Sequence, residues 1–247
     1  MIFLKKTTNA FGIVSLIISV TAFFCFFLAE RMGLLHIEKI ITALLLFFFG
    51  YLSAFFGCSG NNSREKGRRR LKTAFLFFFF LYIVIFIDFT LIDGTFGRNI
   101  SNIFSLDSNE IGEYIKGNTN FAPFKTVKIF ISAYKDETLS MGAIIENILG
   151  NFFVLTPFAL FAPCAFSGMR KWFNFFAFCS IMVIAVEVLQ LVFLTGSTDI
   201  DDFLLNVSGG MFGFLILHIP PVKKIVSALT FGLFGMDKNE IKSKCEN

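Results

Sequence analysis

Six long apolar runs constrain the fold of this chain more than any other feature of its sequence. Each run is about 17 to 25 residues long, which a helix with a 1.5 Å rise per residue needs to cross the ~30 Å hydrocarbon core of a bilayer. Of the 247 residues, 55% are hydrophobic and only 16% are charged, too few polar residues to cover a soluble surface. The sequence therefore predicts an all-α fold, a polytopic membrane helix bundle with six transmembrane helices. The predicted spans are residues 10–29, 40–57, 73–92, 143–166, 172–194 and 203–219.

The basic residues between these spans predict the side of the membrane on which each connection lies. If both termini lie in the cytoplasm, the cytoplasmic segments hold 15 of the 22 lysines and arginines, and the opposite segments hold 7. Cytoplasmic loops of membrane proteins are enriched in these residues. We therefore expect a multi-pass protein of the cell membrane with cytoplasmic N- and C-termini. The most basic loop, residues 58–72, is interpreted as a topology signal, so no nucleic-acid partner is expected.

The spans divide the chain into three predicted parts. Residues 1–72 form a transmembrane hairpin and a basic loop, residues 73–219 form a core of four spans, and residues 220–247 form a basic tail. The core contains the only long hydrophilic segment, residues 93–142, which the topology places outside the cell. After Pro123 the apolar residues of this segment recur with helical spacing. This predicts a helix that either lies along the outer membrane surface, among membrane lipids, or packs onto the bundle.

Three of the spans carry pairs of polar side chains near their outward ends. The members of each pair are three or four residues apart, so they share one helix face. By helical rise, all of them lie within about 12 Å of the outer ends of their spans. Polar groups that face lipid lack hydrogen-bond partners, so we expect the three faces to converge, either as contacts between helices or around a ligand. The pairs are Asn147 and Asn151, Glu187 and Gln190, and Asp202 and Asn206.

Acidic residues are concentrated at the connection between the last two spans. Three aspartates lie in four positions there, and Glu187 lies within the preceding span. An intramembrane carboxylate needs a cation, a proton or water, so these acids could serve as acid and base groups or bind a divalent cation such as Mg²⁺ or Ca²⁺. The alternative is an acidic loop with an N-terminal helix cap. If the acids form a site, we expect Asp202 to cap the last span as well. A transporter is less favoured, because Glu187 is taken as the only charge within a span. The catalytic candidates are Glu187, Asp199, Asp201 and Asp202, and the three aspartates are also the metal candidates.

Four motifs in this order resemble the VanZ-like family. They read NFAPFKTV, NILGNFFVLTPFALFAP, EVLQ and DIDDFLLNVSGGMFGF, and the resemblance covers about residues 73–219. Family members often carry an arginine shortly before DIDD, where this chain has Ser197 and Thr198. The resemblance adds Asn120 of the first motif to the polar residues. The binding candidates are then Asn120, Asn147, Asn151, Gln190 and Asn206.

The resemblance implies a role in the cell envelope, since the namesake of the family is associated with low-level resistance to teicoplanin. On this basis we expect an outward-facing polar site that lowers susceptibility to teicoplanin-type lipoglycopeptides. The alternative is an intramembrane enzyme that uses Glu187 and the aspartates to modify a lipid-linked or phospholipid headgroup. The expected partners are membrane lipids together with a lipid-linked cell-wall precursor or a lipoglycopeptide. The resemblance implies no particular chemical reaction, so both functions stay open.

Overall fold

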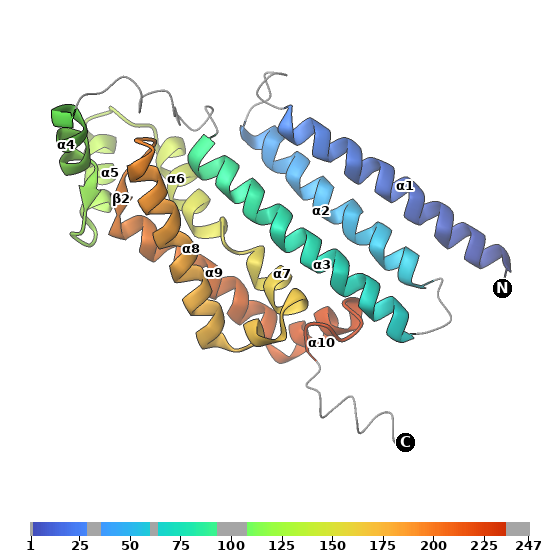
Figure 1. The fold of residues 1–247 in the computed structure, drawn as a ribbon. Helices are drawn as coiled ribbons and strands as arrows, with labels where there is room; N and C mark the ends of the chain where they lie inside the picture. Colours follow the sequence, from blue (N-terminus) through green and yellow to red (C-terminus); the bar gives the residue numbers. More distant parts are fainter. Residues whose placement is uncertain (1, 29–35, 60–63, 93–107, 236–247) are drawn as a thin grey trace. The chain divides into compact units, whose positions relative to one another are not determined.

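A computed structural model describes residues 2–28, 36–59, 64–92 and 108–235 of the chain (Figure 1). These residues are almost entirely helical, and they include one pair of two-residue strands. The chain forms two compact units, one made of residues 1–80 and 220–247 and the other of residues 81–219. Helix α3 (Arg64–Ile87) begins in the first unit and ends in the second.

The first unit contains helices α1 (Ile2–Phe27), α2 (His36–Ser59) and α10 (Pro220–Leu229). Helices α1 and α2 lie side by side and run in opposite directions (Figure 1). They are joined by a hydrogen bond of 2.9 Å from the Ser19 hydroxyl to the Leu46 carbonyl oxygen. The Tyr51 hydroxyl donates to the Leu229 carbonyl oxygen at 3.0 Å, which connects α2 to the end of α10.

The second unit is built around helix α9, which packs against α6, α7 and α8. Its interior is rich in aromatic rings, including Phe158 and Phe175, both fully buried. Tyr82 packs edge-on against Phe158 and donates a hydrogen bond of 2.6 Å to the Val154 carbonyl oxygen. The elements of this unit, after α3, are the π-helical turn η1 (Asp88–Ile92), α4 (Ser108–Gly117), β1 (Thr119–Asn120), α5 (Lys125–Lys135), α6 (Met141–Phe153), α7 (Phe158–Ala165), the 3₁₀ turn η4 (Ser167–Arg170), α8 (Trp172–Val192), β2 (Thr198–Asp199) and α9 (Ile200–His218).

A glycine on α9 allows α6 to approach that helix closely. A Cβ atom added at Gly209 would lie 1.5 Å from the carbonyl oxygen of Phe152, closer than any two such atoms can come. The Thr156 hydroxyl donates to the Gly209 carbonyl oxygen at 3.3 Å in the same region. The short distance between α6 and α9 brings the polar residues at the start of α9 within reach of α6.

Within the described residues, five helical segments are long and apolar enough to cross a membrane, which indicates a multi-pass membrane protein. A further apolar helix, Ala10–Phe26, is shorter than these five. A sixth span in this first helix and the cytoplasmic location of both termini therefore remain predictions. The five segments are Glu38–Phe56, Gly67–Leu91, Met141–Ala165, Trp172–Val192 and Ile200–His218.

The helix expected after Pro123 is present as α5 (Lys125–Lys135). None of its residues is buried, and Ile131 and Tyr134 keep 52% and 49% of their surfaces exposed. Its position along a membrane surface remains a prediction. Residues 93–107, which form the first part of the predicted hydrophilic segment, lie outside the described residues.

Candidate functional site

Asp199 joins the start of α9 to β1 and to the first turn of α5. Strands β1 and β2 pair in parallel, with Asn120 opposite Asp199. The Asn120 side-chain amide donates to Asp199 Oδ1 at 3.1 Å, and the Thr126 hydroxyl donates to Asp199 Oδ2. Asp199 Oδ1 also accepts from the backbone N–H of Asp201 at 2.9 Å, so Asp199 is the N-cap of α9. The expectation that Asp202 would cap this helix was wrong, because α9 begins three residues earlier than the predicted span.

Asp201 holds the first turn of α5. Its Oδ1 accepts from the backbone N–H of Phe124 at 2.6 Å, and its Oδ2 accepts from the backbone N–H of Thr126 at 2.9 Å. The first N–H groups of a helix have no partner within the helix, and a carboxylate is a strong acceptor for them. Asp201 thus caps α5 across 75 residues of sequence and is itself only 4% exposed. Asp199 and Asp201 together attach the β1–α5 segment to α9.

Asp202 faces helix α6. Its Oδ1 accepts from the Asn151 side-chain amide at 2.7 Å, so the predicted polar faces of these two helices do meet. The Asn206 side-chain amide donates to the Asp202 backbone carbonyl at 2.7 Å, within α9. Asn147 is exposed and lies at the limit of hydrogen-bond distance, 3.5 Å, from the Asn151 amide. Asn151, Asp202 and Asn206 therefore cluster together, and Asn147 lies at the edge of this cluster.

Glu187 is the buried acid of helix α8. Only 9% of its surface is exposed, and its Oε1 atom has no hydrogen-bond donor among the described residues. Its carboxylate interacts electrostatically with those of Asp202 and Asp199. Its backbone carbonyl accepts from the Thr198 hydroxyl at 3.3 Å. Three acids from α8 and the start of α9 therefore lie close together, and one oxygen atom of this group has no protein partner in the described part of the chain.

Gln190, one turn after Glu187, turns toward the end of α3. Its side-chain amide donates to the Thr90 carbonyl oxygen at 2.9 Å. Thr90 lies in the π-helical turn η1, where the wider backbone turn changes the usual pairing of carbonyl groups. Gln190 therefore connects α8 to η1, the turn that follows α3, and the sequence offered no signal for this partner.

The interpretation of Glu187 as the only charge within a span was wrong. Asp88 lies in the candidate span Gly67–Leu91, and Glu146 lies in the candidate span Met141–Ala165. Both could have been found by scanning the apolar runs for acidic residues.

Thr126 and Tyr114 were also missed, although they hold the same end of the unit together. The Tyr114 hydroxyl donates to the Gly196 carbonyl oxygen at 2.9 Å.

The chemistry open to this end of the unit is that of carboxyl and amide groups. Among residues 2–28, 36–59, 64–92 and 108–235, no group of three or more His, Cys, Asp and Glu side chains is arranged to hold a metal ion. A divalent cation at Asp199, Asp201 and Asp202 remains a prediction, and so does a catalytic role for these residues. The two most buried aspartates, Asp199 and Asp201, accept hydrogen bonds that stabilise the fold.

The apolar helices and the buried polar cluster define a class, helical proteins with membrane-spanning segments and a polar site at one end. A family model described as VanZ/LLP1 matches residues 78–221, which is more than half of the chain. The chain therefore belongs to the VanZ/LLP1 family. The match contains every candidate site residue. Comparisons with curated proteins and with solved structures found no significant match.

Proposed function

We propose that this VanZ/LLP1-family protein lowers the susceptibility of a cell to teicoplanin-type lipoglycopeptides by binding a polar group at its outward-facing site. In this proposal the protein crosses the cell membrane several times with both termini in the cytoplasm, and the start of α9 faces the outside. A lipid-anchored compound at the outer membrane surface then meets the polar cluster directly.

The Oε1 atom of Glu187, which has no donor among the described residues, carries this proposal. A buried acceptor without a donor costs about 1 to 3 kcal/mol, so it is rarely kept for stability alone. A ligand whose hydroxyl or ammonium group donates a hydrogen bond to this oxygen would supply the missing partner. Asp202 and Asn151, which are joined by a hydrogen bond, provide further polar atoms at the same end of the unit.

Expression in a sensitive Gram-positive host tests this function. We expect cells with the protein to tolerate more teicoplanin than cells with an empty vector, and to show no change toward a glycopeptide that lacks an acyl chain. The second compound is the matched control, because it shares the peptide target and lacks the lipid anchor. Unchanged tolerance of teicoplanin at verified expression would remove drug protection as the function.

A second candidate function is an intramembrane enzyme that modifies a lipid-linked or phospholipid headgroup. The observation that favours it is that Glu187 lies at the same end of the unit as Asp199 and Asp202, where the hydroxyl of Thr198, the residue before Asp199, donates to the Glu187 carbonyl oxygen. Neighbouring carboxyl groups in different surroundings can act as general acid and general base. In this candidate Glu187 and Asp202 exchange a proton with the substrate, and Asp199 and Asp201 hold the site together.

Mass spectrometry of total lipids tests the enzymatic candidate. Cells that express the wild type should accumulate or lose a polar lipid relative to cells that express Glu187→Gln or Asp202→Asn at equal levels. Identical lipid profiles for all three proteins would exclude a reaction on the lipids that the cell accumulates. The drug-tolerance experiment is read separately, so the two functions can fail independently.

A further inference from the structure

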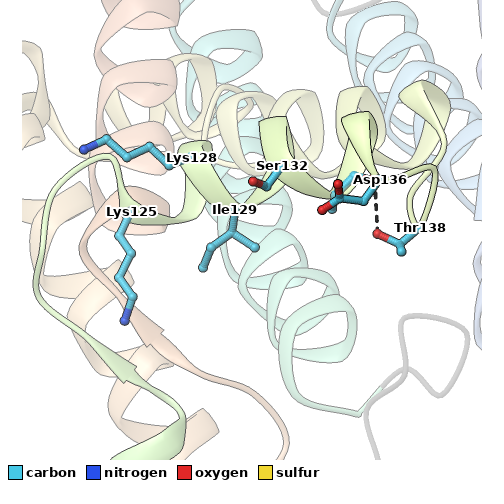
Figure 2. Close-up of a pocket in the computed structure, with 7 residues that line it drawn as sticks. Lys125, Lys128, Ile129, Ser132, Asp136 and Thr138 are labelled. Carbon is cyan, nitrogen blue, oxygen red and sulfur yellow. Dashed lines mark hydrogen bonds between the residues drawn. The ribbon is translucent and has the colours of Figure 1, made fainter.

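A second polar surface lies on helix α5 and is made of residues other than those that bind the carboxylates of Asp199 and Asp201. Here a pocket with a volume of about 410 Å³ runs along the helix, within the size range of small-molecule sites (Figure 2). Both lysine side chains lie at one end of the pocket, and Asp136 and Thr138 lie at the other. The lining residues are Lys125, Lys128, Ile129, Ser132, Ala133, Asp136 and Thr138.

The basic end of this pocket offers hydrogen-bond donors that have no partner among the described residues. Lys125 and Lys128 are three residues apart and exposed, and neither makes an ion pair within the described ranges. Ser132, one turn beyond Lys128, lines the pocket and has a hydroxyl group that makes no hydrogen bond to the described residues. Two ammonium groups and a hydroxyl on adjacent turns suit the oxygen atoms of a phosphate group.

The other end of the pocket has the opposite character. The Thr138 hydroxyl donates to the Ala133 carbonyl oxygen at 3.0 Å, which fixes the chain where it leaves α5. Asp136 is exposed and lies about 12 Å from Lys128 along the helix axis by helical rise. A carboxylate there repels a second anionic group and accepts hydrogen bonds from a hydroxyl. Between the two ends, Ile129 provides an apolar wall with 52% of its surface exposed.

The position of α5 places this pocket beside the beginnings of two candidate spans. Helix α6, which begins the candidate span Met141–Ala165, follows α5 after five residues. The first turn of α5 is hydrogen-bonded to Asp201, at the beginning of the candidate span Ile200–His218. Residues at the ends of membrane spans lie at the depth of the lipid headgroups.

We propose that the α5 pocket binds the headgroup of an anionic phospholipid of the phosphatidylglycerol type. The phosphate contacts Lys125, Lys128 and Ser132, and a headgroup hydroxyl donates to Asp136. Ile129 contacts the apolar part of the lipid next to the phosphate. This inference does not rest on the function proposed for Glu187, because none of the pocket residues belongs to that site.

Native mass spectrometry of the full-length protein in neutral detergent tests this site. The protein is titrated with phosphatidylglycerol or phosphatidylcholine, as the wild type, as the pocket variant Lys125→Ala/Lys128→Ala, and as the control variant Lys116→Ala/Lys135→Ala. The control removes the same charge from exposed lysines of α4 and α5 outside the pocket. We expect the pocket variant to bind phosphatidylglycerol about 30-fold more weakly than the wild type, and the control variant to bind it as the wild type does.

Three results would overturn the proposal. One is an equal loss of affinity in both lysine variants, which would show a general effect of charge. Another is equal binding of phosphatidylcholine and phosphatidylglycerol by the wild type. The third is displacement of the lipid by inorganic phosphate at the same concentration, which would identify the ligand as a free anion. Because all four lysines are exposed, we expect equal unfolding midpoints for the variants, and these are measured in the same preparations.

A further variant tests the role of Asp136. With Asp136→Ala, we expect the preference of the pocket for phosphatidylglycerol over phosphatidic acid to disappear, because phosphatidic acid has no headgroup hydroxyl. A preference that survives this substitution would contradict the placement of the hydroxyl at Asp136.

Discussion

Asp201 and Glu187 are both buried acids of the second unit, but their hydrogen bonding differs. Each oxygen of Asp201 accepts from a backbone N–H group of the α5 segment. Glu187 Oε1 accepts from no donor among the described residues. The stability of the fold explains Asp201, whereas a buried acceptor without a donor costs free energy, and in our proposal a ligand or a substrate satisfies Glu187.

Replacing Asp201 should loosen the connection between α5 and α9. We expect Asp201→Ala to lower the free energy of unfolding by about 2 to 3 kcal/mol, since two charge-assisted hydrogen bonds are lost. The unfolding midpoint of the purified protein in detergent measures this change, and trypsin should cleave α5 faster at Lys125 and Lys128. Asp136→Ala, which removes an exposed acid from the other end of α5, should leave the midpoint unchanged. Equal midpoints for Asp201→Ala and the wild type would contradict the capping role.

At the scale of helices, the contact between α6 and α9 depends on the absence of a side chain at Gly209. We expect Gly209→Ala to destabilise the protein by about 3 kcal/mol or more, because the added Cβ overlaps the Phe152 carbonyl oxygen. Gly150→Ala on α6 is the matched control, since a Cβ there meets no atom within 4 Å. The control should unfold at the wild-type midpoint or above it. A wild-type midpoint for Gly209→Ala would mean that α6 and α9 lie farther apart than described.

The helices were largely predictable from the sequence, because apolar length and spacing are local properties. The candidate spans that include α8 and α9 lie close to the predicted ones, and α5 was expected from its spacing. The partners of the site residues were less predictable. Thr126, Phe124 and Asn120 meet Asp199 and Asp201 across more than 70 residues of sequence, and no local pattern encodes such pairs.

The polar faces of the helices were predicted in part. The i, i+4 spacing of Asp202 and Asn206 identified the face that meets α6 through Asn151. The same reasoning placed Gln190 in this cluster, but its side-chain amide donates a hydrogen bond to the Thr90 carbonyl oxygen in a π-helical turn. Periodicity predicts which side of a helix is polar, but it does not predict which neighbouring backbone has a carbonyl group available there.

For the whole molecule, the proposed topology predicts opposite accessibilities for two exposed lysines. In a variant without native cysteines, Lys116→Cys on α4 should react with a membrane-impermeant maleimide in intact cells. Lys171→Cys, in the turn before α8, should react only after the membrane is permeabilised. The excess of lysine and arginine in the predicted cytoplasmic segments is the reason for this assignment. The reverse pattern of labelling would show that the protein has the opposite orientation in the membrane, with the polar site on the cytoplasmic side.

The central claim, that the buried acid of α8 serves a ligand and not the fold, is tested most directly by comparing two Glu→Gln variants. Teicoplanin tolerance and the unfolding midpoint are measured at equal expression for the wild type, Glu187→Gln and the control Glu146→Gln, which alters an exposed acid of α6. We predict that Glu187→Gln unfolds at the wild-type temperature or above it but confers no tolerance, and that Glu146→Gln retains the tolerance of the wild type. Wild-type tolerance in Glu187→Gln, or a loss of tolerance that parallels a loss of stability, would contradict the claim.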